Sequence, residues 1–171
     1  MKNLIYSLLT VLFFTSCQQQ KMAYVDNGKV INEYQGKIDI EEKFKALDEV
    51  FKKKTDSVGQ AFQLEAQAFQ LEAEKLSQEK AQAKYQELSQ RQQYLQQQTQ
   101  FEQQQMQQAF QVEIDSAITE VKDFVKDYGK KNGYTYILGT SDAQATVLFG
   151  AEENDLTQTI LDALNAEYEK K

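Results

Sequence analysis

The chain is 171 residues long and carries a net charge of −7, with 26 acidic side chains against 19 basic ones. It has one cysteine and no histidine, tryptophan or proline. A single cysteine excludes an internal disulfide, and the lack of histidine excludes a Cys/His metal cluster. The acidic balance argues against nucleic acid as a partner and against simple adsorption to anionic lipid.

Residues 1–16 have the three parts of an export signal: a basic start, an apolar run that ends at Phe14, and two small residues. The run is too short to span a bilayer, so we expect a signal peptide that is removed. The residues up to Cys17 read Phe-Thr-Ser-Cys and are similar to the lipobox of bacterial lipoproteins, with Phe14 where leucine is usual. We therefore expect lipidation of Cys17, with residues 17–21 as a tether. The alternative is an ordinary signal peptide followed by an incidental cysteine.

Residues 22–36 predict a strand, a turn and a short helix. Met22–Val25 is an apolar run, and the Asp-Asn-Gly sequence that follows it is a turn signal. Val30, Ile31 and Tyr34 then recur at helical spacing, and Gly36 is expected to end this unit.

Residues 37–131 form the longest stretch of uniform composition in the chain, and the two shorter ends lie on either side of it. This stretch has no proline and is crowded with glutamine, glutamate, lysine and alanine, which are good helix formers. Apolar residues recur at intervals of three, four and seven, and the heptad Ala61–Gln67 is repeated almost letter for letter by Ala68–Glu74. Asp39 and Glu42 predict a capping box at its start. The pattern predicts coiled-coil arms.

A single helix over this stretch would extend about 140 Å, so two antiparallel arms that bury their apolar stripes against each other are more economical. We expect the chain to reverse between Ser77 and Tyr85, where the stripe thins and charges cluster, although no glycine, proline or asparagine marks a turn. The alternative is a disordered, glutamine-rich segment. Apolar residues at helical spacing throughout the stretch argue against disorder.

The stretch after the arms begins with a stop signal and continues with β-rich sequence. Gly129, Asn132 and Gly133 predict the end of the returning arm. Tyr134–Leu138 and Ala145–Phe149 are β-rich runs joined by a link of hairpin length. Two further strands are therefore expected here.

A closing helix is expected after Gly150, capped by Asn154 or Asp155. One apolar face of this helix is predicted to consist of Leu156, Ile160, Leu164 and Tyr168. The predicted fold class is α+β: a coiled-coil helical hairpin over residues 37–131 projects from a small β body. That body is predicted to be built by residues 22–36 together with residues 132–171.

Three stretches carry a family resemblance: AYVDNGKVINEY at residues 23–34, the glutamine-rich hairpin, and YTYIL at 134–138 followed by ATVLF at 145–149. With these stretches the chain resembles the Skp/OmpH family of periplasmic chaperones. The resemblance implies a homotrimer in which short strands of three chains join into a β body that carries three helical hairpins. Between the hairpins, unfolded outer-membrane β-barrel proteins would be held without ATP or any cofactor. Together with the lipobox, it implies a periplasmic protein anchored to a membrane through Cys17, with the outer membrane expected.

Two features depart from the family pattern. Its better-known members are strongly basic, whereas this chain is acidic and has 20 glutamines between Gln60 and Gln111. The expected lipid anchor is the second departure. Aromatic residues of the arms are candidates for client contact, and the alternative is that they form the seam between the arms. The candidates are Phe62, Phe69, Tyr85, Tyr94, Phe101 and Phe110.

Other function classes fit the sequence less well. A coiled-coil lipoprotein that spaces membrane and cell wall would explain Cys17 and the hairpin but not the strand-rich ends. An adaptor of an efflux system needs larger flanking β domains than this chain offers. An enzyme is not expected, because no nucleophile, base and oxyanion site can be assembled from these residues. Pairs such as Glu113 with Asp115 are expected to be surface charges.

Overall fold

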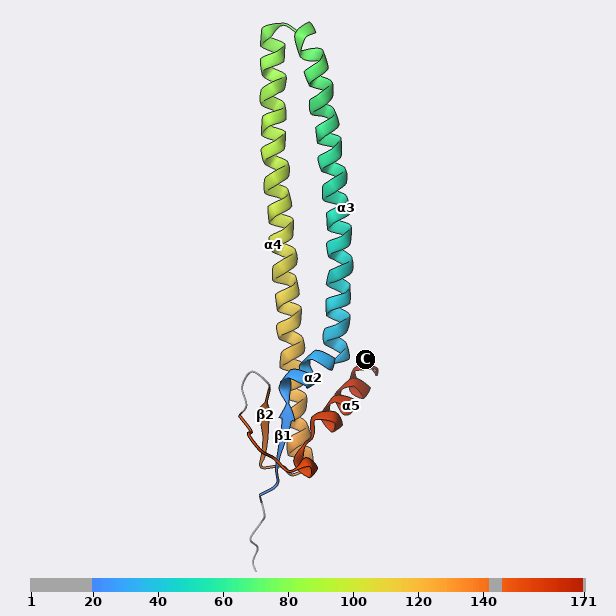
Figure 1. The fold of residues 1–171 in the computed structure, drawn as a ribbon, viewed down its shortest axis with the longest axis vertical. Helices are drawn as coiled ribbons and strands as arrows, with labels where there is room; N and C mark the ends of the chain where they lie inside the picture. The colour runs from blue at the N-terminus through green and yellow to red at the C-terminus, as the bar shows by residue number, and fades with distance from the viewer. Residues whose placement is uncertain (1–19, 142–145, 171) are drawn as a thin grey trace, which may run out of the picture.

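The computed structural model describes residues 20–141 and 146–170, so the predictions for the signal peptide and Cys17 lie outside the described residues. Two long antiparallel helices form a hairpin that stands on a small base (Figure 1). The elements in chain order are β1 (Met22–Asp26), α2 (Asn27–Glu33), α3 (Gln35–Glu72), the 3₁₀ turn η2 (Ala73–Lys75), α4 (Gln78–Lys131), β2 (Tyr136–Thr140), the 3₁₀ turn η3 (Glu152–Asn154) and α5 (Thr157–Tyr168).

The two arms are α3, with 38 residues, and α4, with 54 residues. At 1.5 Å per residue α4 is about 80 Å long. It is the longer arm because it continues past the start of α3 into the base (Figure 1). Apolar side chains meet between the arms: the rings of Phe44 and Phe110 pack edge to face at 5.3 Å, and Leu88 is buried. The expected antiparallel hairpin is therefore present.

The hairpin reverses earlier than the sequence suggested. α3 ends at Glu72, and α4 begins after Ser77, whose hydroxyl oxygen accepts a hydrogen bond from the backbone N–H of Lys80 at 3.4 Å. The expected reversal between Ser77 and Tyr85 is wrong because residues 78–85 are good helix formers and extend α4. Serine in the N-cap position marks the true boundary.

The lower end of α3 also differs from the prediction. Tyr34 has extended backbone angles, with φ −67° and ψ 120°, and separates α2 from α3. Gly36 and the proposed capping box at Asp39 therefore lie inside α3 instead of at its boundary. The carboxylate of Asp39 accepts a hydrogen bond from the Tyr168 hydroxyl at 2.9 Å. Gly36 lies directly under the Tyr34 ring, so a close approach explains this glycine better than helix termination.

The base contains a two-stranded parallel sheet in which Met22 pairs with Tyr136 and Asp26 pairs with Thr140. Parallel strands need a long crossover connection, and here the whole helical hairpin is that connection. Ala23 and Val25 of β1 are buried on the inner face of the sheet. The two ends of the chain thus form one body, as expected.

The returning arm and the strands after it fit the prediction in part. Asn132 caps α4 and Gly133 has a positive φ of +71°, as a helix C-terminus favours. Gly129, however, is buried inside α4, where a Cβ would lie 3.2 Å from the Ile137 side chain. β2 begins at Tyr136, two residues later than expected.

The third predicted strand, Ala145–Phe149, is not formed by its described residues 146–149. Leu148 and Phe149 are 91% and 89% exposed. A β-rich run forms a strand only where a neighbouring strand offers backbone partners, and β2 does not pair with this run within the described chain.

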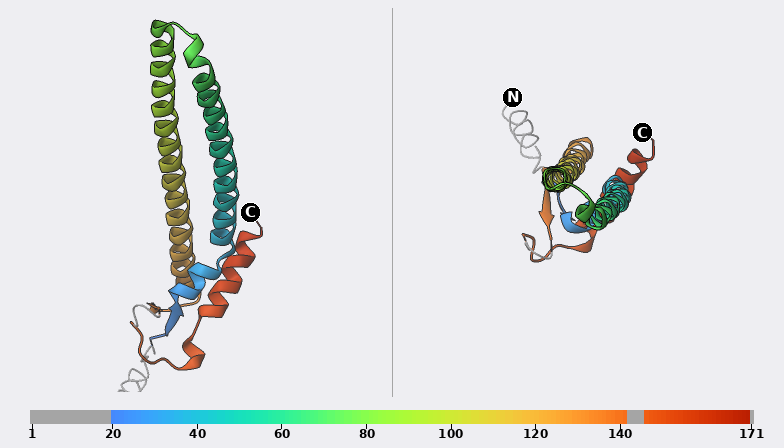
Figure 2. Two further views of the ribbon diagram at one scale, coloured as in Figure 1. Left: turned by 45° about the horizontal axis from the view of Figure 1, so that its top comes forward. Right: turned by 90° about the horizontal axis from the view of Figure 1, so that it is seen from above.

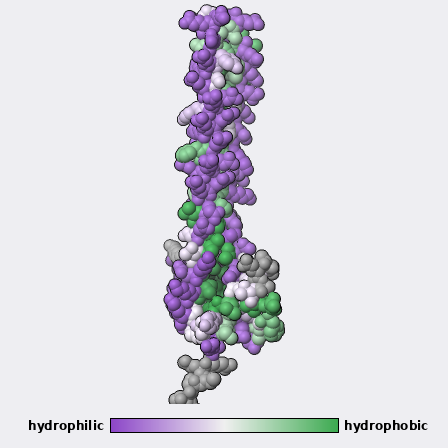
Figure 3. Space-filling model, turned by 90° about the vertical axis from the view of Figure 1, so that its left-hand side faces the viewer, coloured by the Kyte–Doolittle hydropathy of each residue, from purple (hydrophilic) through white to green (hydrophobic). Residues whose placement is uncertain are grey.

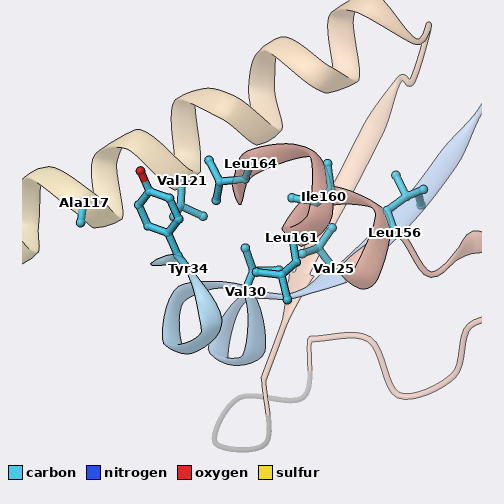
Figure 4. Packing of buried hydrophobic residues seen from close by; sticks show 10 residues of the cluster. Val25, Val30, Tyr34, Ala117, Val121, Leu156, Ile160, Leu161 and Leu164 are labelled. Carbon is cyan, nitrogen blue, oxygen red and sulfur yellow. The ribbon is translucent and has the colours of Figure 1, made fainter. Parts of the chain in front are cut away.

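The core lies where α5 packs against α2, β1 and the lower part of α4 (Figure 4). Its residues come from both ends of the chain and from the lower part of α4: Ala23, Val25, Val30, Tyr34, Ala117, Val121, Leu156, Ile160, Leu161 and Leu164. Hydrogen bonds of Thr157 hold the N-terminus of α5 in place. Thr157 accepts a hydrogen bond from the Asp26 backbone at 2.9 Å and donates its own backbone N–H to Asp155 at 2.8 Å. Asp155, one of the two expected caps, thus supports the start of α5, but the N-cap position itself is Leu156 and not Asn154 or Asp155.

Candidate functional site

Three of the six predicted contact aromatics lie at the seam between the arms. Phe110 packs on Phe44, and Phe62 and Phe69 are half-buried beside hollows between α3 and α4. These side chains hold the hairpin together. Their access to a partner is therefore smaller than the sequence pattern alone suggested.

The other three aromatics are exposed. Tyr85, Tyr94 and Phe101 have 69%, 63% and 59% of their surface accessible. Seven residues return to nearly the same face of a helix, so Tyr94 and Phe101 lie on one face of α4. That face points away from the seam, whereas Tyr85 lies beside the seam and lines a hollow between the arms.

The exposed side chains belong to a second apolar row on each arm, which the sequence analysis missed. On the side away from the seam, α3 and α4 carry large apolar residues that are between 59% and 79% exposed. We call these six residues the outer row: Val50, Leu64, Leu71, Tyr94, Phe101 and Val112. Their spacings of 7, 11 and 14 residues keep each helix's members on one side.

The duplicated heptad contained the signal for this row. In each copy, a leucine stands two residues after the phenylalanine, which is about 200° around a helix of 3.6 residues per turn. Phe62 and Phe69 therefore face the seam, while Leu64 and Leu71 face outward. The sequence pattern was interpreted as one apolar stripe per helix, the seam, and the second stripe, the outer row, was therefore not recognised.

The arms are loosely packed at mid-length. A hollow of about 370 Å³ lies between them, lined mainly by apolar atoms of Val58, Phe62, Leu95 and their neighbours. Gly59 borders it, and a Cβ added there would meet no atom within 4 Å. The apolar side chains of the two arms therefore do not fill the space between them at this level.

Ion pairs join the arms along their length. Lys43 contacts Glu113 at 2.6 Å, Lys54 contacts Glu102 at 2.7 Å, and Glu65 contacts both Lys84 and Arg91. The hydrogen bond from Lys54 lowers the pKa of Glu102, so this carboxylate is charged at neutral pH. Because these pairs are exposed to solvent, each contributes little to the free energy of unfolding. Their more important effect is that they direct charge toward the seam and not outward.

A second apolar surface lies on the base. The outer face of the sheet exposes Met22, Tyr136 and Leu138, next to the exposed Leu148 and Phe149. We call these five residues the base patch. Figure 3 shows hydrophobic side chains gathered over the base, whereas the shaft is mainly hydrophilic with scattered hydrophobic islands. Seen along the hairpin, β2 lies on the α4 side of the base, and α5 lies on the α3 side (Figure 2).

The family can be named from this arrangement and one comparison. The model of the OmpH-like outer membrane protein family matches residues 21–164, which include the base, both arms and most of α5. The chain belongs to the OmpH-like family. The outer row and the base patch both lie within the matched residues, so they are features of this chain's OmpH-like region.

A crystal structure of an OmpH-like protein from Caulobacter crescentus, described as a candidate outer membrane chaperone, has the same fold. The two align with a TM-score of 0.76 and 12% identity over 89% of this chain and 88% of that chain. At this identity the likeness concerns the fold. No match to a curated protein was found.

Two further observations bound the functions of this OmpH-like chain. Of the helices that the structure describes, none is long and apolar enough to cross a membrane. The described residues also contain no group of three or more His, Cys, Asp or Glu side chains placed to hold a metal ion. The surfaces that remain to be explained are the outer row and the base patch.

Proposed function

We propose that this OmpH-like protein is an ATP-independent holdase chaperone of the periplasm. It binds unfolded outer-membrane β-barrel proteins in a cavity between the helical hairpins of the assembled protein and prevents their aggregation. The observation that carries the proposal is the outer row: large apolar side chains are exposed along a polar rod that has its own separate seam. Membership of the OmpH-like family supports the same function.

The chemistry of the arms suits a client whose apolar strands are exposed to water. Such strands aggregate through their edges and apolar faces. Partial burial of one outer-row side chain contributes on the order of 1 kcal/mol. Several contacts together hold a client, and each of them breaks easily. Release therefore needs no energy source.

The base patch supports assembly into a homotrimer. Clusters of apolar side chains that are exposed to solvent on a protein surface mark interaction sites. Three copies that share their base patches would bring three hairpins around one cavity and would give the β-rich run that ends at Phe149 a neighbouring strand. The test is the mass of the lipid-free protein in solution. We expect a trimer for the wild type and a smaller species for the double variant Leu148→Ser with Phe149→Ser, which alters only exposed side chains. A monomeric wild type would refute the trimer.

The lipid anchor at Cys17 is a separate proposal. We expect the wild type to stay with membranes through a salt wash and Cys17→Ser to be released. Retention of the substituted protein would show that Cys17 does not carry the anchor. Fractionation of inner and outer membranes assigns the membrane that holds it.

The holdase function is tested by light scattering. A urea-unfolded outer-membrane β-barrel protein is diluted into buffer with an equal amount of the lipid-free protein, and no nucleotide is added. We expect scattering to be suppressed. Unchanged scattering would refute the holdase function and favour a coiled-coil lipoprotein that acts as a spacer.

A further inference from the structure

The part of the hairpin just below its charged tip is almost free of charge. Residues 57–71 of α3 and 88–111 of α4, all of them described, contain three side chains that are charged at pH 7: Glu65, Arg91 and Glu102. Each of the three is engaged in an ion pair that crosses between the arms. We call these two ranges the neutral zone. Its outward faces offer a partner no unpaired charge.

Four members of the outer row lie in the neutral zone, and we call them the upper row: Leu64, Leu71, Tyr94 and Phe101. On α4 they are flanked by the exposed glutamines Gln90, Gln97, Gln105 and Gln108. In the described part of the chain, none of these four amides is paired with another residue. Each amide can both donate and accept hydrogen bonds. The surface thus combines spaced apolar side chains with neutral donors and acceptors.

The spacing of the row excludes two kinds of occupant. A second helix of this chain, packed as a coiled coil, needs apolar residues at two positions of every heptad, and this row supplies one or fewer. A lipid surface needs a broad, continuous apolar face, whereas these side chains are separated by glutamines. An unfolded polypeptide requires neither two apolar positions in every heptad nor a continuous apolar face, because it presents scattered apolar side chains and unpaired backbone N–H and C=O groups.

Resting on the holdase function proposed above, we infer that the upper row and its glutamines bind unfolded chain segments without using charge. Apolar side chains of the client pack on the row, and its backbone groups exchange hydrogen bonds with the amides. Binding is then nearly independent of ionic strength, since salt screens interactions between charges and does not weaken apolar contacts. The net charge of the client has little influence on affinity for the same reason.

Two matched variants test the inference. The row variant carries Leu64→Gln, Leu71→Gln, Tyr94→Gln and Phe101→Gln. The control variant carries Ala61→Gln, Ala68→Gln and Ala109→Gln, which add glutamine at exposed positions one turn from residues of the outer row and leave the row itself intact. Glutamine is a good helix former, so both variants keep the hairpin. Circular dichroism and the mass in solution check this.

The measurement is the affinity for a fluorescently labelled, urea-unfolded outer-membrane β-barrel protein, at about 50 mM and about 500 mM salt. We expect the wild type and the control variant to change less than about twofold with salt, and the row variant to bind at least about tenfold more weakly at both salt concentrations. Wild-type affinity in the row variant, or a wild-type affinity that falls tenfold with salt, would overturn the inference and leave the holdase function standing. A row variant of altered mass would identify the row as a contact between copies. A wild type that binds no client would overturn the function and the inference together.

Discussion

The two glycines inside α3 provide a sharp test of the packing described above. At Gly59 an added methyl group meets nothing within 4 Å. At Gly36 it would lie 2.6 Å from the ring of Tyr34, a side chain that is only 1% exposed. Substitution by alanine is chemically identical at both sites, and we expect it to change the free energy of unfolding in opposite directions.

The magnitudes follow from two competing effects. Alanine is favoured over glycine in a helix interior by about 0.8–1 kcal/mol. Gly59→Ala has no steric cost, so we expect stabilisation of about 0.5–1 kcal/mol. Gly36 is the second residue of α3, so Gly36→Ala gains less, and its methyl group displaces a buried ring, for which overpacking costs about 1–3 kcal/mol. Movement of Tyr34 also disturbs its 2.8 Å hydrogen bond to Glu120, worth about another 1 kcal/mol. The expected net cost is about 1–3 kcal/mol.

The assay is urea unfolding of the lipid-free protein, followed by helical circular dichroism. All variants are compared at one protein concentration, because assembly makes apparent stability depend on concentration. We expect a higher midpoint for Gly59→Ala and a lower one for Gly36→Ala. As a control, Gly36→Ala in a Tyr34→Leu background no longer meets the ring and should not destabilise. If Gly36→Ala stabilises the wild type as Gly59→Ala does, the close approach of Tyr34 is refuted.

Three further predictions concern the base and the seam. Ile160 is fully buried, so Ile160→Ala should cost about 2–5 kcal/mol, seen as a lower thermal midpoint; a loss below about 1 kcal/mol would contradict the observed core. Burial raises the pKa of the Tyr34 hydroxyl in the folded protein, so this group loses its proton at a lower pH in the unfolded state than in the folded state. Its contribution to stability is therefore present below about pH 10 and is lost as the pH rises through the folded pKa. Urea unfolding between about pH 9 and pH 11 should show a shallower decline for Tyr34→Phe than for the wild type. Lys54→Gln removes an exposed pair with Glu102 and should lower the urea midpoint only slightly, with the difference from the wild type shrinking at high salt.

The hairpin could be predicted because its signal is long and redundant. Helix-forming composition, the absence of proline and the repeated heptads all favour the same structure over residues 37–131. The union of the two chain ends followed from the apolar runs on either side of the arms. Burial of Val25 and Ile160 in one core confirms that part of the fold.

Other features depended on contacts that a single sequence does not reveal. The reversal between Glu72 and Ser77 is marked by one serine cap, Ser77, which is a weak signal beside strong helix formers on both sides. Gly36 suggested a helix end because a glycine required by a neighbouring ring looks the same in the sequence. The strand expected to end at Phe149 needs a partner edge, and no pattern within the run specifies one. The outer row was hidden because the seam alone accounts for the heptad rhythm.

The parallel pairing of β1 with β2 has a consequence for the order in which the protein folds. The two strands are separated by roughly 110 residues, and closing so long a loop in a flexible chain carries a large entropic cost. Once the two arms have paired from their tip downward, the start of α3 lies close to α4, and β1 and β2 have only a short distance left to cover before they pair. Folding should therefore proceed downward from the tip, with the strands meeting last. A substitution that weakens the turn near Ser77 would then slow formation of the β1–β2 sheet at the opposite end of the molecule.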